Sequence, residues 1–338
     1  YNTAVGVDAG TSVTTGVQNT LIGALAGDAL TDADHNVAVG YNALTTDTLG
    51  SKSIAIGRNA LTTQNFTTAT DSYNVAVGYN TAQNITTGVQ NTLIGSLAGD
   101  AFTTGTLNVA LGYNSLGADT KGNRNTALGR NTLAAQNFTT STSAYNVAAG
   151  FNAGGAVTTG LENTLIGSVA GDALTDADYN VALGSSALGS DTLGSRSTAL
   201  GYSALFNQNF TTATDSNNTA VGYAAGSQVT TGIRNTFIGS GAGDSIQASS
   251  ENTAVGYNAL TTDTTGSQST AFGAYALQTQ NYSTGTNSFN TAVGYAAGGT
   301  VTTGTLNTLI GSYAGNEMTT GSKNVILGSY DGNGGGLD

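Results

Sequence analysis

The sequence predicts an all-β fold, a parallel β-solenoid (β-roll) in which the chain winds into about 19 stacked coils. A pentapeptide of the form Asn-Thr/Val-Ala-Val-Gly recurs nineteen times from Asn2, at spacings of 17, 17, 17 and 21 residues that repeat every 72. Within it, β-branched and apolar residues alternate with the period of a strand. The 49 glycines and the absence of proline suit a stack in which nearly every backbone N–H forms a hydrogen bond.

The first part of each coil is predicted to be a short strand. We number each coil from its opening Asn as position 1, so the first coil runs from Asn2 to Gln18. Position 2 is β-branched and position 4 is apolar in all nineteen coils. Stacking pairs each strand in parallel with its equivalent, about 4.8 Å away. The opening Asn, present in sixteen of nineteen coils, is predicted to form a hydrogen-bonded ladder along the stack.

Position 5 is always glycine, which predicts a structural corner where a Cβ would obstruct the neighbouring backbone. In the first six coils these glycines are Gly6, Gly23, Gly40, Gly57, Gly78 and Gly95.

Positions 9 and 12 vary in a compensating way. The first two coils of each 72-residue unit have a small residue at position 9 and an apolar one at position 12, as in Gly27 and Leu30. The last two have leucine at position 9 and Asp or Gln at position 12, as in Leu44 and Asp47. One large side chain per coil is therefore predicted to fill the same region from two alternative positions.

The repeat organisation predicts one continuous solenoid domain over residues 1–323, followed by a terminal coil and glycine-rich end at 324–338. The chain opens within the repeat pattern, so we interpret it as a piece of a longer protein. No apolar run approaches the roughly 20 residues needed to cross a bilayer, so no membrane insertion by this segment is expected.

Position 3 suggests that the chain binds copies of itself. It should point opposite to positions 2 and 4, yet it is also apolar throughout, so one of the two faces needs a cover. The simplest cover is two further copies in a cyclic homotrimer, and a dimer or two-sided burial within a wide coil are the alternatives. The predicted interface residues include Ala4, Leu21, Ala38, Leu93, Leu165, Phe237 and Leu309.

Two coils carry a family resemblance. The segments Asn36-Val-Ala-Val-Gly-Tyr-Asn-Ala-Leu and Asn252-Thr-Ala-Val-Gly-Tyr-Asn-Ala-Leu resemble the head repeats of trimeric autotransporter adhesins. They are also similar to the glycine- and threonine-rich repeats of phage tail fibres. The resemblance implies a left-handed parallel β-roll that trimerises about a central axis, outside the cell on a cell or virion surface. The coils of this chain are longer than is typical of the adhesin heads.

Composition excludes several classes of function. Eight Lys and Arg against 20 Asp and Glu give a net charge of −12, which argues against nucleic acid as a partner. With no cysteine and one histidine, thiol chemistry and a His-pair metal site are excluded. No phosphate-binding loop or nucleophile elbow is present, so we expect no enzymatic activity and no cofactor.

The 21-residue coils offer candidate partner-binding loops. Each inserts four residues after a Gln-Asn-aromatic motif, whose aromatic residues are Phe66, Phe138, Phe210 and Tyr282. These loops could present aromatic and Thr groups to a surface glycan or a cell-surface receptor, or the aromatic could pack back on its own coil. An aromatic also follows the corner glycine in many coils, as at Tyr41, and such a ladder stacks on sugars or on itself.

Clustered carboxylates are weak candidates for a calcium site. They are Asp28, Asp32, Asp34 and Asp172. Carboxylates in one turn can hold calcium, but an Asx-type turn explains them as well.

The leading functional hypothesis is a structural fibre segment of an extracellular trimeric adhesin, which attaches to surfaces through many equivalent weak sites along a repetitive rod. A virion tail-fibre shaft or receptor-binding segment is the first alternative. An ice-binding β-solenoid is an alternative of another class, which needs a flat, regular Thr array. The Thr-Thr pairs such as Thr14 and Thr15 recur only every 72 residues, which counts against it.

Overall fold

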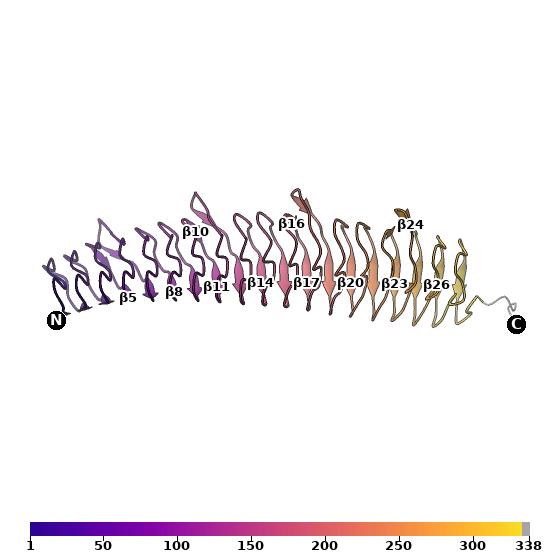
Figure 1. The fold of residues 1–338 in the computed structure, drawn as a ribbon, viewed down its shortest axis with the longest axis horizontal. Coiled ribbons are helices and arrows are strands. Elements are labelled where there is room, and N and C mark those ends of the chain that lie inside the picture. Colours follow the sequence, from indigo (N-terminus) through magenta and orange to yellow (C-terminus); the bar gives the residue numbers. More distant parts are fainter. Residues whose placement is uncertain (333–338) are drawn as a thin grey trace. The chain divides into compact units, whose positions relative to one another are not determined.

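The computed structural model describes residues 1–332 (Figure 1). The predicted glycine-rich end therefore lies in part, at 333–338, outside the described residues. Over the described range the chain forms strands and turns without a helix, and the predicted all-β solenoid of about 19 coils is confirmed. The chain divides into two compact units, Tyr1–Ser168 (unit 1) and a second that begins at Val169 (unit 2).

Unit 1 contains a parallel sheet in which each three-residue strand comes from positions 2 to 4 of one coil. Successive coils pair in register, so that Thr3 lies opposite Thr20 and Thr20 opposite Val37. The strands are β1 (Thr3–Val5), β2 (Thr20–Ile22), β3 (Val37–Val39), β5 (Ile54–Ile56), β7 (Val75–Val77), β8 (Thr92–Ile94), β9 (Val109–Leu111), β11 (Thr126–Leu128), β13 (Val147–Ala149) and β14 (Thr164–Ile166).

Unit 2 repeats this arrangement. Its strands also pair in parallel with the same register, as Thr198 with Thr219. They are β15 (Val181–Leu183), β17 (Thr198–Leu200), β19 (Thr219–Val221), β20 (Thr236–Ile238), β21 (Thr253–Val255), β23 (Thr270–Phe272), β25 (Thr291–Val293), β26 (Thr308–Ile310) and β27 (Val325–Leu327).

The opening Asn residues form the predicted ladder. The backbone N–H of Asn36 donates to Oδ1 of Asn19 at 2.9 Å, and Nδ2 of Asn36 donates to the Gly50 carbonyl at 2.9 Å. These side chains are buried, so each one satisfies backbone groups of two coils that water cannot reach. This explains why a charged or apolar residue never replaces it.

The chain leaves each strand at the position 5 glycine. Gly40 has φ +137°, a conformation that L side chains rarely adopt, and a Cβ built on it would lie 2.5 Å from the carbonyl oxygen of Gly57 in the next coil. The corner is thus fixed both by backbone conformation and by the close approach of successive coils.

The interior confirms the predicted exchange of volume between positions 9 and 12. Leu44 at position 9 and Leu30 at position 12 are both fully buried. Position 3 also fills the interior, although it was predicted to face another copy. The Leu21 side chain lies between two position 9 glycines, because a Cβ on Gly10 or on Gly27 would come within 2.6 or 2.8 Å of its methyl carbons.

The four extra residues of each 21-residue coil build a two-stranded parallel ribbon. The first ribbon pairs Gly50 with Thr70 and Ser51 with Asp71. Each ribbon lies on the side of its coil away from the three-residue strand (Figure 1). The ribbons are β4 (Gly50–Ser51) with β6 (Thr70–Asp71), β10 (Gly122–Asn123) with β12 (Thr142–Ser143), β16 (Gly194–Ser195) with β18 (Thr214–Asp215), and β22 (Gly266–Ser267) with β24 (Thr286–Asn287).

Candidate functional site: the exposed strand face

Position 3 points into the coil, so the predicted oligomer interface is wrong. Leu21, Ala38, Leu93, Leu165, Phe237 and Leu309 all have 1% or less of their surface exposed within the single chain. Only Ala4, in the first coil, is exposed. A side chain with no accessible surface cannot contact another copy, and these residues instead fill the narrow interior between the strand and the glycines opposite it.

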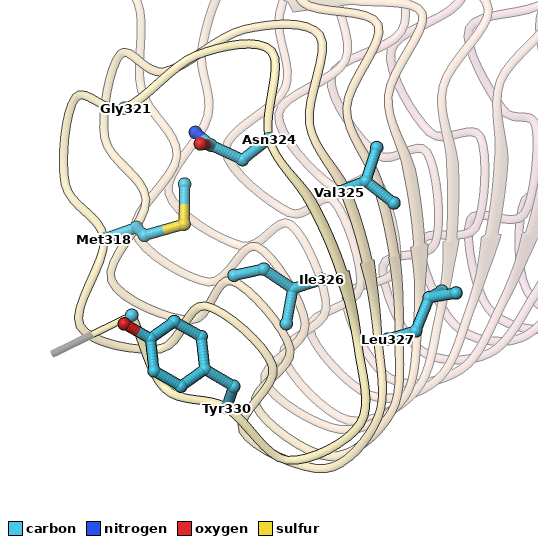
Figure 2. Close-up of a pocket in the computed structure, with 8 residues that line it drawn as sticks. Met318, Gly321, Asn324, Val325, Ile326, Leu327 and Tyr330 are labelled. Atoms are coloured by element: carbon cyan, nitrogen blue, oxygen red, sulfur yellow. The ribbon is translucent and has the colours of Figure 1, made fainter. Parts of the chain in front are cut away.

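Positions 2 and 4 point outwards, and we call their two rows, from Thr3 and Val5 to Val325 and Leu327, the strand face. Figure 2 shows the alternation in the last described coil, where Ile326 points into the coil and Val325 and Leu327 point away from it. In earlier coils the strand-face residues are half-exposed, and Ile22 and Leu111 keep 39% and 48% of their surface accessible.

The strand face carries no charge. Its two rows contain only Thr, Val, Ile, Leu, Ala and Phe in all nineteen coils. With strands about 4.8 Å apart and three residues long, it covers roughly 400–500 Å² in each unit. This footprint, part aliphatic and part threonine, is comparable in size with the largest exposed patches on a typical monomer, and such patches are often functional. We therefore take it as the candidate site.

The Thr residues of the strand face keep their hydroxyl groups free. Within residues 1–332, none of the position 2 threonines forms a side-chain hydrogen bond with another protein group. Each hydroxyl offers one donor and two acceptor lone pairs to water or to a ligand. The face therefore combines aliphatic surface with regularly placed hydrogen-bonding groups.

Charged and aromatic side chains border the face along position 0, the residue before each opening Asn. This residue has left-handed backbone, as at Tyr73 (φ 51°) and Arg124 (φ 60°). The Arg124 guanidinium lies 5.5 Å from the ring centre of Tyr145, and Nζ of Lys52 lies 2.5 Å from Oδ2 of Asp71. That hydrogen bond raises the pKa of Lys52 and lowers the pKa of Asp71. The charges of this border are thus largely paired with their neighbours.

The aromatic residues after the corner glycines form the other border at position 6. Arg58 lies between Tyr41 and Tyr79, at 5.8 and 5.6 Å from their ring centres. Tyr202 and Tyr223 stack with their centres 5.5 Å apart. Their ring faces are turned to each other and to guanidinium groups, which favours the alternative that the ladder stacks on itself.

The aromatic residues of the four loops are buried, so these rings are not presented to a glycan or a receptor. Phe66, Phe138, Phe210 and Tyr282 are only 5–6% exposed, and the alternative that they pack back on their own coils is confirmed. The Tyr282 hydroxyl donates to the Gly304 carbonyl at 2.7 Å, and burial raises its pKa to about 12. These rings cover the interior because the small glycines beneath them, such as Gly50, leave room.

A closed polar network lies beneath each loop. In the first, Nε2 of Gln64 donates to Asp47 Oδ2 at 2.6 Å and to Ser53 Oγ at 2.8 Å, and Asn74 donates to Oε1 of Gln64 at 2.8 Å. Burial raises the pKa of the equivalent carboxyl groups Asp119 and Asp263 even though Gln side chains donate to them. All these groups bond to one another and are enclosed, so the network joins coils and offers nothing to a ligand.

The carboxylates considered for calcium do not converge. Asp28 accepts a hydrogen bond from Thr45, Asp32 accepts from Thr15 at 2.5 Å, and Asp34 accepts from the Val17 N–H at 2.7 Å. Asp172 holds the place of Asp28 in a later repeat. The part of the chain that the structure describes contains no group of three or more acidic or His side chains that could hold a metal ion. The three carboxylates of unit 1 instead tie one coil to the next.

A hollow at the end of unit 2 belongs to the core. Met318, Ile326 and Tyr330 line it (Figure 2), and Ile326 and Met318 occupy the interior positions 3 and 12 of their coils. The hollow is the last described stretch of the coil interior, so we assign it no separate role.

The strand face was not predicted from the sequence, because position 3 was predicted to be the face that another copy covers. The available signal was threonine, which occurs at position 2 in twelve of the nineteen coils and never at position 3. No family model, curated protein or solved structure matches the chain. Residues 1–332 include no helix long and apolar enough to cross a membrane.

Proposed function

We propose that the chain is a structural fibre segment of an extracellular adhesin, which attaches to a surface through the strand face. The observation that supports this proposal is the face itself, an uncharged, half-exposed pair of rows that recurs in every coil. A solenoid gains stability coil by coil, and in the same way it multiplies a weak contact along its length. Many equivalent contacts on one rigid support give avidity without any single strong site.

The face suits an extended target better than a compact protein partner. A standard protein–protein interface buries about 800 Å² on each side and depends on aromatic or Arg anchors held in pockets. The strand face provides roughly 400–500 Å² in each unit, and its two rows contain no Tyr, Trp or Arg. A flat, repetitive surface, such as a layer of neutral surface glycan, matches these properties.

The same face would also have to serve in a homotrimer, because position 3 is enclosed. Self-association and surface attachment therefore compete for one set of side chains. Light scattering separates them, since a trimer has a mass near 100 kDa, which is three times 33.5 kDa.

A pair of matched variants tests the proposal. Leu111→Lys with Ile310→Lys adds two charges to the strand face, and Leu107→Lys with Leu306→Lys adds the same charges at position 0 beside the same strands. All four residues are 40–48% exposed, and lysine occurs naturally at position 0 in Lys52 and Lys323. We expect both proteins to fold, and only the face variant to lose adhesion to coated surfaces and to cells.

Equal adhesion of the two variants would overturn attachment through the face. Attachment through the face would also be overturned if the parent chain is a trimer and only the face variant has a mass of 33.5 kDa. In that case other copies cover the face in the parent chain.

A further inference from the structure

The strand face of unit 2 contains an unbroken row of threonine. Seven successive coils have Thr at position 2, and the strand register places each one directly opposite the next. Figure 1 shows these strands, β17 to β26, side by side. In unit 1, by contrast, no more than two successive coils have Thr at this position. The seven residues are Thr198, Thr219, Thr236, Thr253, Thr270, Thr291 and Thr308.

The row is a regular array of available hydroxyl groups. Neighbouring threonines are about 4.8 Å apart because the strands are. None of the seven side chains hydrogen-bonds to another group in the described residues, although all seven are partly accessible. Their β-branched side chains have few χ1 rotamers, so the array loses little entropy when it meets a ligand.

A parallel row of aliphatic groups lies beside the threonines. Position 4 follows two residues later, about 7 Å along the strand, and holds Leu200, Val221, Ile238, Val255, Phe272, Val293 and Ile310. The two rows make a grid of hydroxyl and apolar groups with a constant spacing in each direction. Liquid water does not match such a grid, whereas a solid with a repeating array of hydrogen-bonding groups does.

The lack of charge argues against extended targets that are themselves charged. Neither row contains a charged residue, so the grid offers no electrostatic attraction to polyanions, to charged glycans or to a charged membrane surface. Its area in unit 2, roughly 400 Å², is half of what a standard protein interface buries on each side. The ligand that remains is neutral, rigid, flat and rich in both donors and acceptors.

We infer that the strand face of unit 2 binds ice, with the seven threonines holding water molecules of the crystal surface and the position 4 side chains excluding liquid water beside them. This inference rests on the proposed role of the strand face in attachment and names crystalline water as its target. The irregular Thr-Thr pairs that count against ice binding lie elsewhere in the coil, so they do not affect this row.

The test uses the full chain and measures thermal hysteresis, inhibition of ice recrystallisation, and adsorption of the fluorescently labelled protein to a single ice crystal. Thr253→Tyr places a ring at the centre of the row and divides seven threonines into two runs of three. We expect it to lower ice activity by more than about tenfold, since the contact is multivalent. Thr253→Val keeps the shape, removes one hydroxyl and is expected to lose less.

One control carries the same new side chain away from the strand face. Ser240→Tyr lies at position 6, where tyrosine occurs naturally in other coils. We expect it to retain the ice activity of the parent chain. Circular dichroism of each variant establishes that the fold is unchanged.

The inference is overturned if the parent chain shows no hysteresis and no adsorption to ice, or if Thr253→Tyr, correctly folded, remains fully active. Adsorption to crystalline cellulose but not to ice would also overturn it, while leaving attachment through the strand face intact. Failure of that broader proposal is detected separately, by equal adhesion of the Lys variants at positions 4 and 0.

Discussion

Phe237 provides the most direct test of how the coil interior is filled. It is the largest position 3 side chain and is fully buried. Its ring lies between two glycines, because a Cβ on Gly226 would come within 2.6 Å of it and a Cβ on Gly243 within 2.4 Å. Phe237→Ala therefore leaves a cavity whose glycine walls have no side chains to close it. We expect a loss of about 3–5 kcal/mol in the free energy of unfolding.

A second substitution should recover part of that loss. The following coil has Ala254 at position 3 and Leu260 at position 9, and both are fully buried. Gly243 has φ 58° and Leu260 has φ 53°, so the backbone at Gly243 accepts a leucine. Gly243→Leu alone should destabilise the protein by collision with Phe237, whereas the double variant has the same residues as the neighbouring coil at positions 3 and 9, with Ile246 unchanged at position 12. We expect a favourable coupling energy of about 1–3 kcal/mol between the two substitutions.

The assay is unfolding in guanidinium chloride followed by far-UV circular dichroism for the parent chain, both single variants and the double variant. Hydrogen exchange of peptides from residues 226–260 locates the change within unit 2. A double variant less stable than Phe237→Ala would refute the idea that positions 3 and 9 fill one shared volume. A loss below about 1 kcal/mol in Phe237→Ala would refute the cavity estimate itself.

Two further predictions concern the corner and the buried carboxyl groups. Gly40→Ala should lower stability by more than about 2 kcal/mol because of its backbone conformation and its contact with the next coil, whereas Gly285→Ala, whose Cβ meets nothing within 4 Å, should leave the melting temperature nearly unchanged. Burial raises the pKa of Asp263 above its ordinary 3.8, so the folded chain binds this proton more tightly than the unfolded chain does. The stability this carboxyl provides is therefore greatest below pH 3.8 and declines as the pH rises through the raised pKa. Denaturant unfolding of the parent chain and of Asp263→Asn should show that the free energy of unfolding of the variant increases relative to that of the parent as the pH rises across that range.

Equal melting temperatures for the two glycine variants would contradict the role of the corner. A difference between parent and Asp263→Asn that stays constant with pH would contradict the raised pKa.

Much of the fold follows from local sequence. The corner glycine and the opening Asn are features of single coils, and each imposes the same geometry wherever it recurs. The direction of the strand faces does not follow in this way. Residues at positions 2, 3 and 4, such as Thr20, Leu21 and Ile22, all suit an interior by composition. The deciding quantity is the space left by Gly10 and Gly27 across the coil, which depends on how the rest of the coil folds back.

The candidate site was not predicted for the same reason, because the composition of the strand does not show which of its positions point outwards. Once Leu21 is placed inside, the threonines and aliphatic residues on either side of it must lie outside, and the row from Thr198 to Thr308 is visible in the printed sequence. The burial of the loop aromatic residues was not predicted for a different reason. Burial of Phe66 depends on Gly50 in the preceding coil and on the polar network around Asp47, so no single loop sequence predicts it.

The left-handed backbone of the coils has a consequence for how the chain folds. One coil contains three such non-glycine residues, Asn131, Leu133 and Tyr145. At about 1–2 kcal/mol each, an isolated coil would bear roughly 3–6 kcal/mol of conformational cost. Hydrogen bonds to adjacent coils offset it, as when the Leu133 N–H donates to the Ala153 carbonyl at 3.1 Å. We therefore expect formation of any first pair of coils to be the slow step of folding, and each later coil to be added faster to an edge that already has the required shape.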